Sequence, residues 1–169
     1  MIIVSDTSPI RYLVLIRAID VLQSLFGEII IPPSVAAELS HPKTPIPVRD
    51  WFRSCPSWVN VRAPLSVELI DRLDPGELEA IALAIELDAD RLLIDDNAGK
   101  KAAKKLGVSA IGTLAILDLA GKQGLLNFPQ SLAELESNTN FRMSRSLRDR
   151  LLEEYRDSSG DKPTDTAPE

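Results

Sequence analysis

The sequence is poor in the residues that build many catalytic and metal centres. Cys55 is the only cysteine and His41 the only histidine among 169 residues. A lone cysteine provides neither a disulfide framework nor a cysteine-based metal site. His41 stands beside Pro42 in a proline-rich stretch, which predicts an exposed surface residue. Any active site in this chain must therefore work without histidine.

Long hydrophobic segments and a dinucleotide-binding fingerprint are also missing. No apolar run approaches the roughly 20 residues that a membrane helix needs. The start, Met-Ile-Ile-Val-Ser-Asp, reads as a strand without a basic region, so no secretory signal is expected. No Gly-x-Gly-x-x-Gly follows this strand, which disfavours dinucleotide chemistry. These absences predict a cytoplasmic protein without membrane contact.

The chain has fewer basic than acidic residues, with 19 Lys and Arg against 25 Asp and Glu and a net charge of −6. A protein that binds a phosphate backbone is usually basic, so the balance counts mildly against nucleic acid. A bound metal would offset several carboxylates, and residues 157–169 add further acid. The length suffices for one domain with a full core.

The chain alternates between strand-like and helix-like segments. Apolar, β-rich runs predict strands at residues 1–6, 28–31, 58–61, 91–94 and 108–111. Helices are expected at 8–17, 19–26, 34–39, 67–73, 77–87, 100–106, 113–120, 131–135 and 144–156, with a loop at 41–47. This order predicts an α/β fold: a three-layer α/β/α arrangement around a central, mainly parallel sheet. We expect one domain over residues 1–156 and a disordered acidic tail at 157–169.

Acidic residues stand where two of the apolar runs end. Asp6 closes the first strand, and Asp95 and Asp96 close Leu92–Leu93–Ile94. Ligands gather at the carboxyl edge of parallel sheets. Carboxylates brought together there repel one another unless a cation lies between them, and a divalent, oxygen-preferring cation is the simplest candidate.

Each acid also has a structural interpretation. Asp6 could cap the helix that follows, although Ser8, next to Pro9, is better suited to that task. One of Asp95 and Asp96 could cap the next helix, and only one need face a site, because successive strand side chains point to opposite sides.

Two glutamates are further candidates. Glu38 follows small and apolar residues, which places it at the margin of the core. Glu77 stands three residues after Asp74, the spacing of a capping box. This spacing alone does not separate a metal ligand from a helix cap, and Glu79 competes with Glu77 for the same role.

In combination, these segments resemble PIN-domain proteins. The matching stretches are Asp6–Thr7–Ser8, Pro32–Leu39, Glu77–Ala84 and Leu92–Asp96, with Ala103 and Gly107 following at the family's spacing. The chain looks most like the VapC-like group with a Gly-Glu-x-Glu-Ala helix start and an Asp-Asp pair. The resemblance covers about residues 1–125, and the helices at 131–156 would complete the domain.

The resemblance implies a Mg²⁺- or Mn²⁺-dependent ribonuclease in which acids bind the metal. By position, the implied ligands are Asp6, Glu38, Glu77 and Asp96, with Asp95 just before the last of them. Ser8 matches a hydroxyl that supports the first acid. Two positions depart from the family pattern: Ile94 replaces a threonine, and Glu77 replaces the aspartate of many relatives, which suggests a metal contact through water.

These assignments predict a phosphodiesterase chemistry. A bound metal lowers the pKa of a water and offsets charge on the phosphate, and a carboxylate not fully committed to metal, Asp95 or Glu77, could orient that water. Lys100, Lys101 and Lys104, with Lys105, form a basic stripe after the acid pair, which predicts substrate contacts together with Ser8. Solvated surface charge is the alternative reading for each lysine. A second basic cluster contains Arg142, Arg145, Arg148 and Arg150.

The leading hypothesis is a metal-dependent endoribonuclease, the toxin of a toxin–antitoxin pair. An antitoxin protein covering the acids and a homodimer are expected by analogy, with residues 41–62 and 140–156 as candidate contacts. The aromatic residues Tyr12, Trp51, Phe52 and Trp58 are interpreted as core or interface residues. The alternatives are a non-catalytic PIN-like interaction module and another metal-dependent phosphohydrolase.

Overall fold

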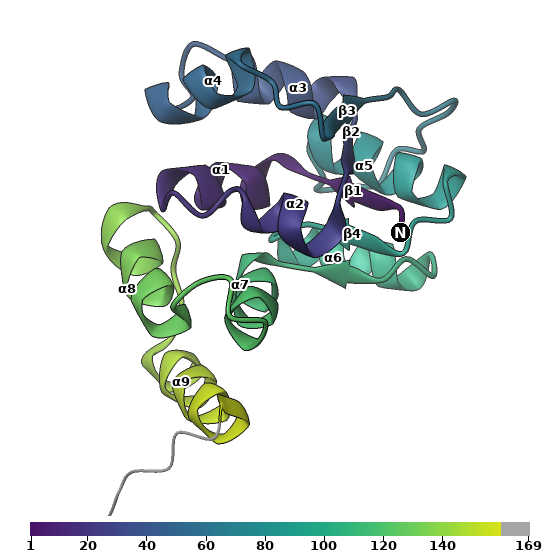
Figure 1. Ribbon diagram of the computed structural model, residues 1–169. Helices are drawn as coiled ribbons and strands as arrows, with labels where there is room; N and C mark the ends of the chain where they lie inside the picture. The colour runs from purple at the N-terminus through teal and green to yellow at the C-terminus, as the bar shows by residue number, and fades with distance from the viewer. Residues whose placement is uncertain (160–169) are drawn as a thin grey trace, which may run out of the picture.

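Five short strands form one sheet in the computed structural model, which describes residues 1–159 (Figure 1). They are β1 (Ile3–Ser5), β2 (Ile29–Ile31), β3 (Val59–Val61), β4 (Arg91–Leu93) and β5 (Ala110–Ile111). The strand order is β3-β2-β1-β4-β5, and every neighbouring pair is parallel. All five predicted strands and the parallel sheet are confirmed.

Successive residues of the central strands enter two different cores. Ile3 and Leu93 belong to one hydrophobic cluster, whereas Val4 and Leu92 belong to the other. The first cluster includes residues of α1 (Thr7–Leu15), α2 (Val21–Phe26), α3 (Pro33–Ser40), α7 (Thr113–Lys122) and α8 (Phe128–Asn138). The second includes residues of α5 (Pro75–Glu86) and α6 (Asn97–Lys105). The period of two along a strand thus buries both faces of the sheet, which confirms the three-layer α/β/α fold.

Two segments differ from the sequence prediction. The helix α4 (Ile46–Arg53) was not expected after the proline-rich stretch; it begins with Pro47 in its first turn, a position that tolerates proline. The helix predicted at residues 67–73 is absent, and that prediction is wrong. Its side chains Val67 and Leu69 are exposed, so this segment lacks the buried apolar face that stabilises a short helix.

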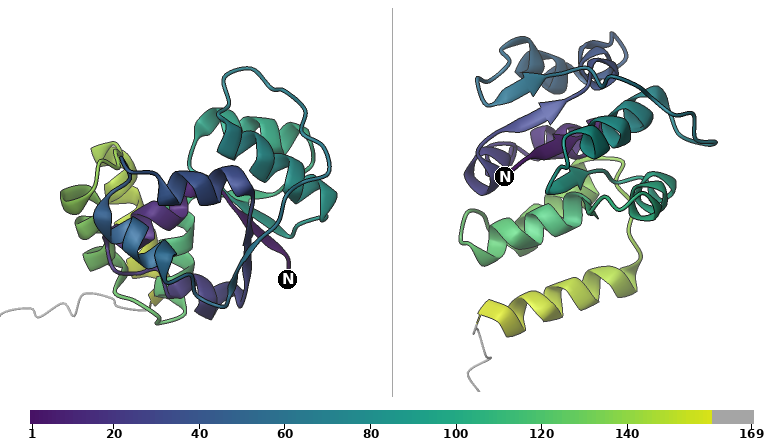
Figure 2. Two further views of the ribbon diagram at one scale, coloured as in Figure 1. Left: turned by 90° about the horizontal axis from the view of Figure 1, so that it is seen from above. Right: turned by 90° about the vertical axis from the view of Figure 1, so that its right-hand side faces the viewer.

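The C-terminal helices are longer than predicted. α8 begins at Phe128 because Asn127 accepts a hydrogen bond from the amide of Gln130 at 2.9 Å. α9 (Arg145–Ser159) lies beside α7 (Figure 2) and extends three residues into the predicted tail 157–169. The remainder of that tail lies outside the described residues, so its disorder stays a prediction. Across residues 1–159, no helix has the length and apolar character needed to cross a bilayer.

The strand order determines where a site can form. The chain leaves β1 for β2 on one side and later returns to β4 on its other side. Ser5 of β1 lies opposite Leu93 of β4, so the residues that follow both strands share one edge of the sheet. Such a reversal of strand order opens a crevice at the carboxyl ends, where open α/β sheets bind ligands.

Candidate active site

Asp6 is a buried carboxylate at the end of β1. Its amide donates to the carbonyl of Leu93 at 2.8 Å, and its side chain is 3% exposed. Asp6, and not Ser8, occupies the N-cap position of α1, so the expected cap at Ser8 is wrong; the Asp6 side chain nevertheless makes no capping hydrogen bond. Burial raises the pKa of Asp6 to about 7, against the opposing Thr7 amide, and negative charges on nearby acids add to the rise.

Those nearby acids are Asp74, Glu77 and Glu38, the last of which comes from α3. The hydroxyl of Thr7 donates to Glu38 Oε2. A Cβ atom on Gly76 would lie 2.7 Å from Glu38 Oε1, so only glycine lets the start of α5 approach this carboxylate so closely. Burial raises the pKa of Glu38, the Thr7 hydroxyl opposes that rise, and Asp74 reinforces it.

Glu77 forms the capping box that its spacing suggested. Its amide donates to Asp74 Oδ1 at 2.8 Å, and the Asp74 amide donates to Glu77 Oε2 at 3.0 Å. The residue is only 8% exposed, and burial raises its pKa, with Asp74, Asp96 and Glu38 adding negative charge. Glu77 is therefore both a helix cap and a member of the acidic group. Its competitor Glu79 accepts instead from the amide of Ser34 at 2.8 Å, at the start of α3.

Asp95 and Asp96 have different environments. Asp96 is exposed and caps α6, because its Oδ2 accepts from the Gly99 amide at 2.8 Å. Asp95 is half-buried and accepts from both the amide and the hydroxyl of Thr113, each at 2.7 Å. Burial raises the pKa of Asp95, although Thr113 and the positive charge of Lys100 oppose the rise.

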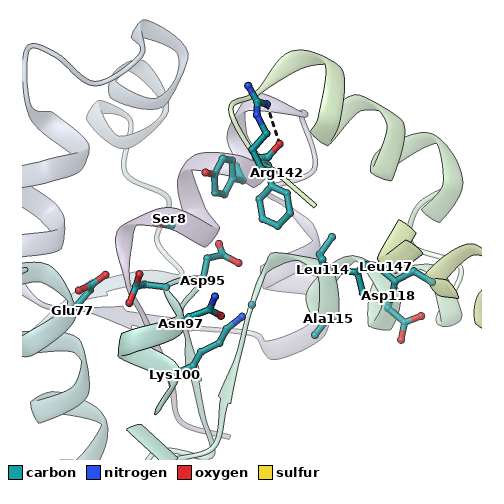
Figure 3. Close-up of a pocket in the computed structure, with 15 residues that line it drawn as sticks. Ser8, Glu77, Asp95, Asn97, Lys100, Leu114, Ala115, Asp118, Arg142 and Leu147 are labelled. Atoms are coloured by element: carbon teal, nitrogen blue, oxygen red, sulfur yellow. Dashed lines mark hydrogen bonds between the residues drawn. The ribbon is translucent and has the colours of Figure 1, made fainter. Parts of the chain in front are cut away.

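A cleft of about 750 Å³ opens along this edge of the sheet (Figure 3). Glu77, Asp95 and Asp96 line it together with Ser8 and Lys100. Asp6 and Glu38 are not among its lining residues. The residues that line its opposite part include Tyr12, Phe141, Arg142, Leu114, Leu147 and Leu151.

The acids fit a hard cation in their chemistry. Every donor in the set is a carboxylate oxygen, the ligand type that Mg²⁺ and Mn²⁺ prefer. Among the salt bridges of residues 1–159, none involves Asp6, Glu38, Glu77, Asp95 or Asp96. Within these residues, Asp6, Glu38, Glu77 and Asp96 therefore have no cationic partner, whereas Asp95 lies close to the positive charge of Lys100. In the same residues, no three acids stand close enough to form a ready metal-binding set.

The basic residues divide into those at the cleft and those outside it. Lys100 lines the cleft, whereas Lys101 and Lys104 are exposed and are not among its lining residues. Arg142 lines the cleft, but Arg148 pairs with Glu136 at 3.3 Å. Only part of each predicted basic cluster is therefore placed to contact a molecule in the cleft.

Sequence reasoning missed several residues that organise the site. Thr7 and Thr113 hold Glu38 and Asp95, and neither was singled out. Thr113 follows Gly112 at the end of β5, so the same strand-end argument, extended one strand further, would have found it. Tyr12 packs against the hydrophobic core, as predicted, and it also lines the cleft wall, which the sequence did not indicate.

Comparisons with known proteins bear on the fold and the family. A PilT N-terminus domain protein from the archaeon Sulfolobus solfataricus P2 is similar in structure, with 22% identity and a TM-score of 0.49 over 85% of this chain and 100% of that one. Among curated proteins, none matches the chain. The model of family DUF3368, described as a PIN domain, matches residues 2–157. The chain therefore belongs to the PIN domain family, whose fold is generally that of a nuclease.

Proposed function

We propose that this protein is a Mg²⁺- or Mn²⁺-dependent endoribonuclease. The observation that carries the proposal is the acidic group at the carboxyl edge of β1 and β4. Its members Asp6, Glu38, Glu77 and Asp96 come from separate elements and form no salt bridge in the described chain. Burial, with a contribution from neighbouring acids, raises the pKa of Asp6, Glu38 and Glu77. A site that concentrates negative charge in this way suits a divalent cation and an anionic substrate bound through it.

Asp6, Glu38, Glu77 and Asp96 are the residues that would hold the metal. A bound cation supplies a water of lowered pKa and offsets negative charge on the phosphate that is cleaved. One oxygen of Glu77 already accepts from the Asp74 amide in the capping box, which leaves the other oxygen for the site. Asp96 likewise has one oxygen on the Gly99 amide.

Asp95 is the best-placed candidate to act on the attacking water. Thr113 fixes its orientation through two hydrogen bonds, and its raised pKa makes it a better proton acceptor than an ordinary aspartate. Lys100 lies beside it, since a Cβ atom on Gly112 would lie 2.7 Å from both Asp95 Oδ1 and Lys100 Nζ. Lys100 is therefore positioned to bind a substrate phosphate.

We further propose that the protein is the toxin of a toxin–antitoxin pair and forms a homodimer. Residues of the candidate contact segment 140–156 contribute Phe141, Arg142 and Leu147 to the cleft wall. An antitoxin bound to this segment would block the cleft. This supports control by a covering protein, although the homodimer rests on family analogy alone.

A non-catalytic PIN-like module is the second candidate. It is favoured by the engagement of Glu77 and Asp96 in helix caps and by the absence of a ready three-acid set within residues 1–159. In that case the chain would keep the acidic group of a PIN domain, but the carboxylates would not be arranged to bind a catalytic metal.

The test is cleavage of a mixed RNA pool in Mn²⁺ by the wild type, by Asp6→Asn and by the control Asp20→Asn. Asp20 is an exposed N-cap aspartate whose side chain makes no capping hydrogen bond. Cleavage that is lost in Asp6→Asn and in chelator, but kept in Asp20→Asn, supports the nuclease. Metal binding without cleavage favours the non-catalytic module, and release of phosphate from small phosphomonoesters favours a different phosphohydrolase.

A further inference from the structure

The part of the cleft opposite the acids is built from two aromatic rings. Tyr12 of α1 and Phe141, between α8 and α9, meet edge to face with ring centroids 5.1 Å apart and an interplanar angle of 83°. The Tyr12 hydroxyl donates to Asn140 Oδ1 at 3.1 Å. Edge-to-face packing and this hydrogen bond hold the ring pair in place. Both rings line the cleft and neither is fully buried.

A cation adjoins the rings. Arg142 is exposed, lines the cleft and donates to the Phe141 carbonyl at 3.3 Å (Figure 3). It takes part in none of the salt bridges found in residues 1–159. Leu147 and Leu151 of α9 line the same cleft. The guanidinium of Arg11 lies over the Tyr12 ring, 5.8 Å from its centroid. The wall therefore combines aromatic rings, the Arg142 guanidinium and an apolar surface, and its lining also includes Asp118, which is paired with Lys122.

We propose that Tyr12, Phe141 and Arg142 form a nucleotide subsite in which one unpaired base rests on the ring pair and Arg142 contacts a neighbouring phosphate. This inference rests on the proposed nuclease function, because the subsite continues directly from the acids and Lys100. The three residues would thus hold an unpaired nucleotide beside the cleaved phosphate without selecting a particular base.

The size and chemistry of the cleft support this occupant. Its 750 Å³ lies within the range of about 300–1,000 Å³ typical of small-ligand sites, which suits one or two nucleotides but not a duplex. Aromatic rings bind bases through their faces, and such stacking requires an unpaired base. Arginine beside the rings provides both phosphate binding and planar contact with a base. A segment of a protein partner would account for the apolar surface. It would not explain why two aromatic rings and an arginine lie next to the proposed site of phosphodiester cleavage.

The ring contribution can be tested by binding in the inactive Asp6→Asn background. Labelled short single-stranded oligoribonucleotides, intact or with one abasic position stepped along the strand, are titrated in Mn²⁺ and followed by fluorescence anisotropy. We expect Tyr12→Leu and Phe141→Leu each to weaken binding of the intact strand about 5- to 100-fold. The strand that is abasic at the subsite should already bind weakly and lose little more in either variant.

Matched variants separate stacking from folding. Tyr12→Phe keeps the ring and should restore the affinity of the intact strand. Phe52→Leu removes a ring that packs beside Trp51, away from the cleft, and should leave affinity unchanged. Far-UV circular dichroism identifies any variant that fails to fold, and the two leucine variants provide independent measurements.

The contribution of Arg142 is measured through salt dependence. Arg142→Gln should weaken binding and reduce the slope of log K against log salt by about 0.7, the value for one contact with a single strand. Arg145→Gln removes an exposed arginine that does not line the cleft, and should leave the slope unchanged.

The results distinguish the subsite from the nuclease proposal. If the wild type cleaves RNA but the ring variants bind intact and abasic strands equally well, the subsite is wrong and the nuclease stands. Equal weakening for both strands would also overturn it, because the rings would then act only on the fold. If the wild type cleaves RNA but no short oligonucleotide binds the Asp6→Asn protein, the subsite is also overturned, and the rings and Arg142 are left free for a protein partner. Absence of any Mn²⁺-dependent cleavage contradicts the nuclease proposal itself.

Discussion

The acidic group at the sheet edge and the aromatic wall of the cleft differ in how their residues affect the stability of the fold. At the acidic edge, buried Asp6 and Glu77 lie near other carboxylates without a cationic partner, so burial and repulsion both raise their pKa values. In the opposite wall, Tyr12 and Phe141 support each other through favourable ring packing. One part of the site thus opposes the metal-free fold, while the other stabilises it. Grouped carboxylates that lower the stability of the metal-free fold are what we expect of a site that binds a cation.

The pH dependence of stability follows from Asp6. Its pKa is about 7 in the folded protein against an ordinary value of 3.8, so the folded state keeps a proton that the unfolded state has lost. Stability therefore declines as the pH rises from about 4 to about 7. A bound cation would reverse that loss at neutral pH, because it favours the ionised carboxylate.

The largest expected effect separates stability from activity at Asp6. Asp6→Asn removes the buried charge, so the free energy of unfolding of the metal-free protein should rise by roughly 1–3 kcal/mol at pH 8. The gain should shrink toward pH 4, where the wild-type carboxyl is protonated. RNA cleavage should be abolished in the same variant. Urea denaturation at both pH values measures the first effect. If the wild type were more stable than Asp6→Asn at pH 8, the claim that the Asp6 charge destabilises the metal-free fold would be contradicted.

Thr113→Val tests the support of Asp95 while keeping side-chain shape. The variant loses the hydroxyl donor to Asp95 Oδ2 but keeps the backbone amide donor to Oδ1. We expect kcat to fall by about 10- to 100-fold and stability by only about 1 kcal/mol. The pH profile should move upward because one hydrogen bond to the ionised form is gone. Ser137→Ala, which removes an exposed hydroxyl that donates to the Ala133 carbonyl away from the cleft, is the control. An unchanged pH profile in Thr113→Val would argue against a catalytic role for Asp95.

Gly76→Ala tests the close approach of α5 to Glu38. The new Cβ atom would meet Glu38 Oε1 at 2.7 Å and displace that carboxylate. Mn²⁺ affinity should fall by about 10-fold, the effect typical of a disturbed ligand environment. Alanine in the first turn favours the helix, so stability should change little. If the Mn²⁺ affinity measured by isothermal titration calorimetry were unaltered, Glu38 would not be one of the metal ligands.

The smallest expected effects are on KM and distinguish the lysines of α6 that contact the substrate from those that do not. Lys100→Gln should raise KM for RNA several-fold, because Lys100 lines the cleft beside Asp95. Lys101→Gln and Lys104→Gln should change KM by less than about twofold, since exposed charges outside the cleft contribute little. Equal effects at all three positions would instead indicate that Lys100, Lys101 and Lys104 all contact the substrate, as the sequence analysis predicted.

Local patterns in the sequence predicted the architecture well. The apolar runs identified all five strands, and parallel geometry brought Asp6 and the Asp95–Asp96 pair to one edge. The capping box at Asp74 and Glu77 has the three-residue spacing seen in the sequence, and its hydrogen bonds need only local chain geometry. These features depend on neighbours in the sequence or on the rules of parallel pairing.

Features that depend on contacts between residues far apart in the sequence could not be predicted from the sequence alone. Thr113 reaches Asp95 across 18 positions, and Tyr12 meets Phe141 only because α1 and the α8–α9 connection pack together. The segment 67–73 has helix-like spacing but no core to pack on, so spacing predicted a helix that tertiary structure does not stabilise. Which lysines of α6 face the cleft likewise depends on the rotation of that helix against the sheet.

The central claim is that acids from separate elements share one cation, and Mn²⁺ titration by calorimetry tests it most directly. The wild type should bind Mn²⁺ at neutral pH with release of protons, because Asp6 is partly protonated there before binding. Asp6→Asn should weaken that binding at least about tenfold and eliminate most of the proton release. A wild type that binds no Mn²⁺, or one that binds it equally well in Asp6→Asn, would contradict the account.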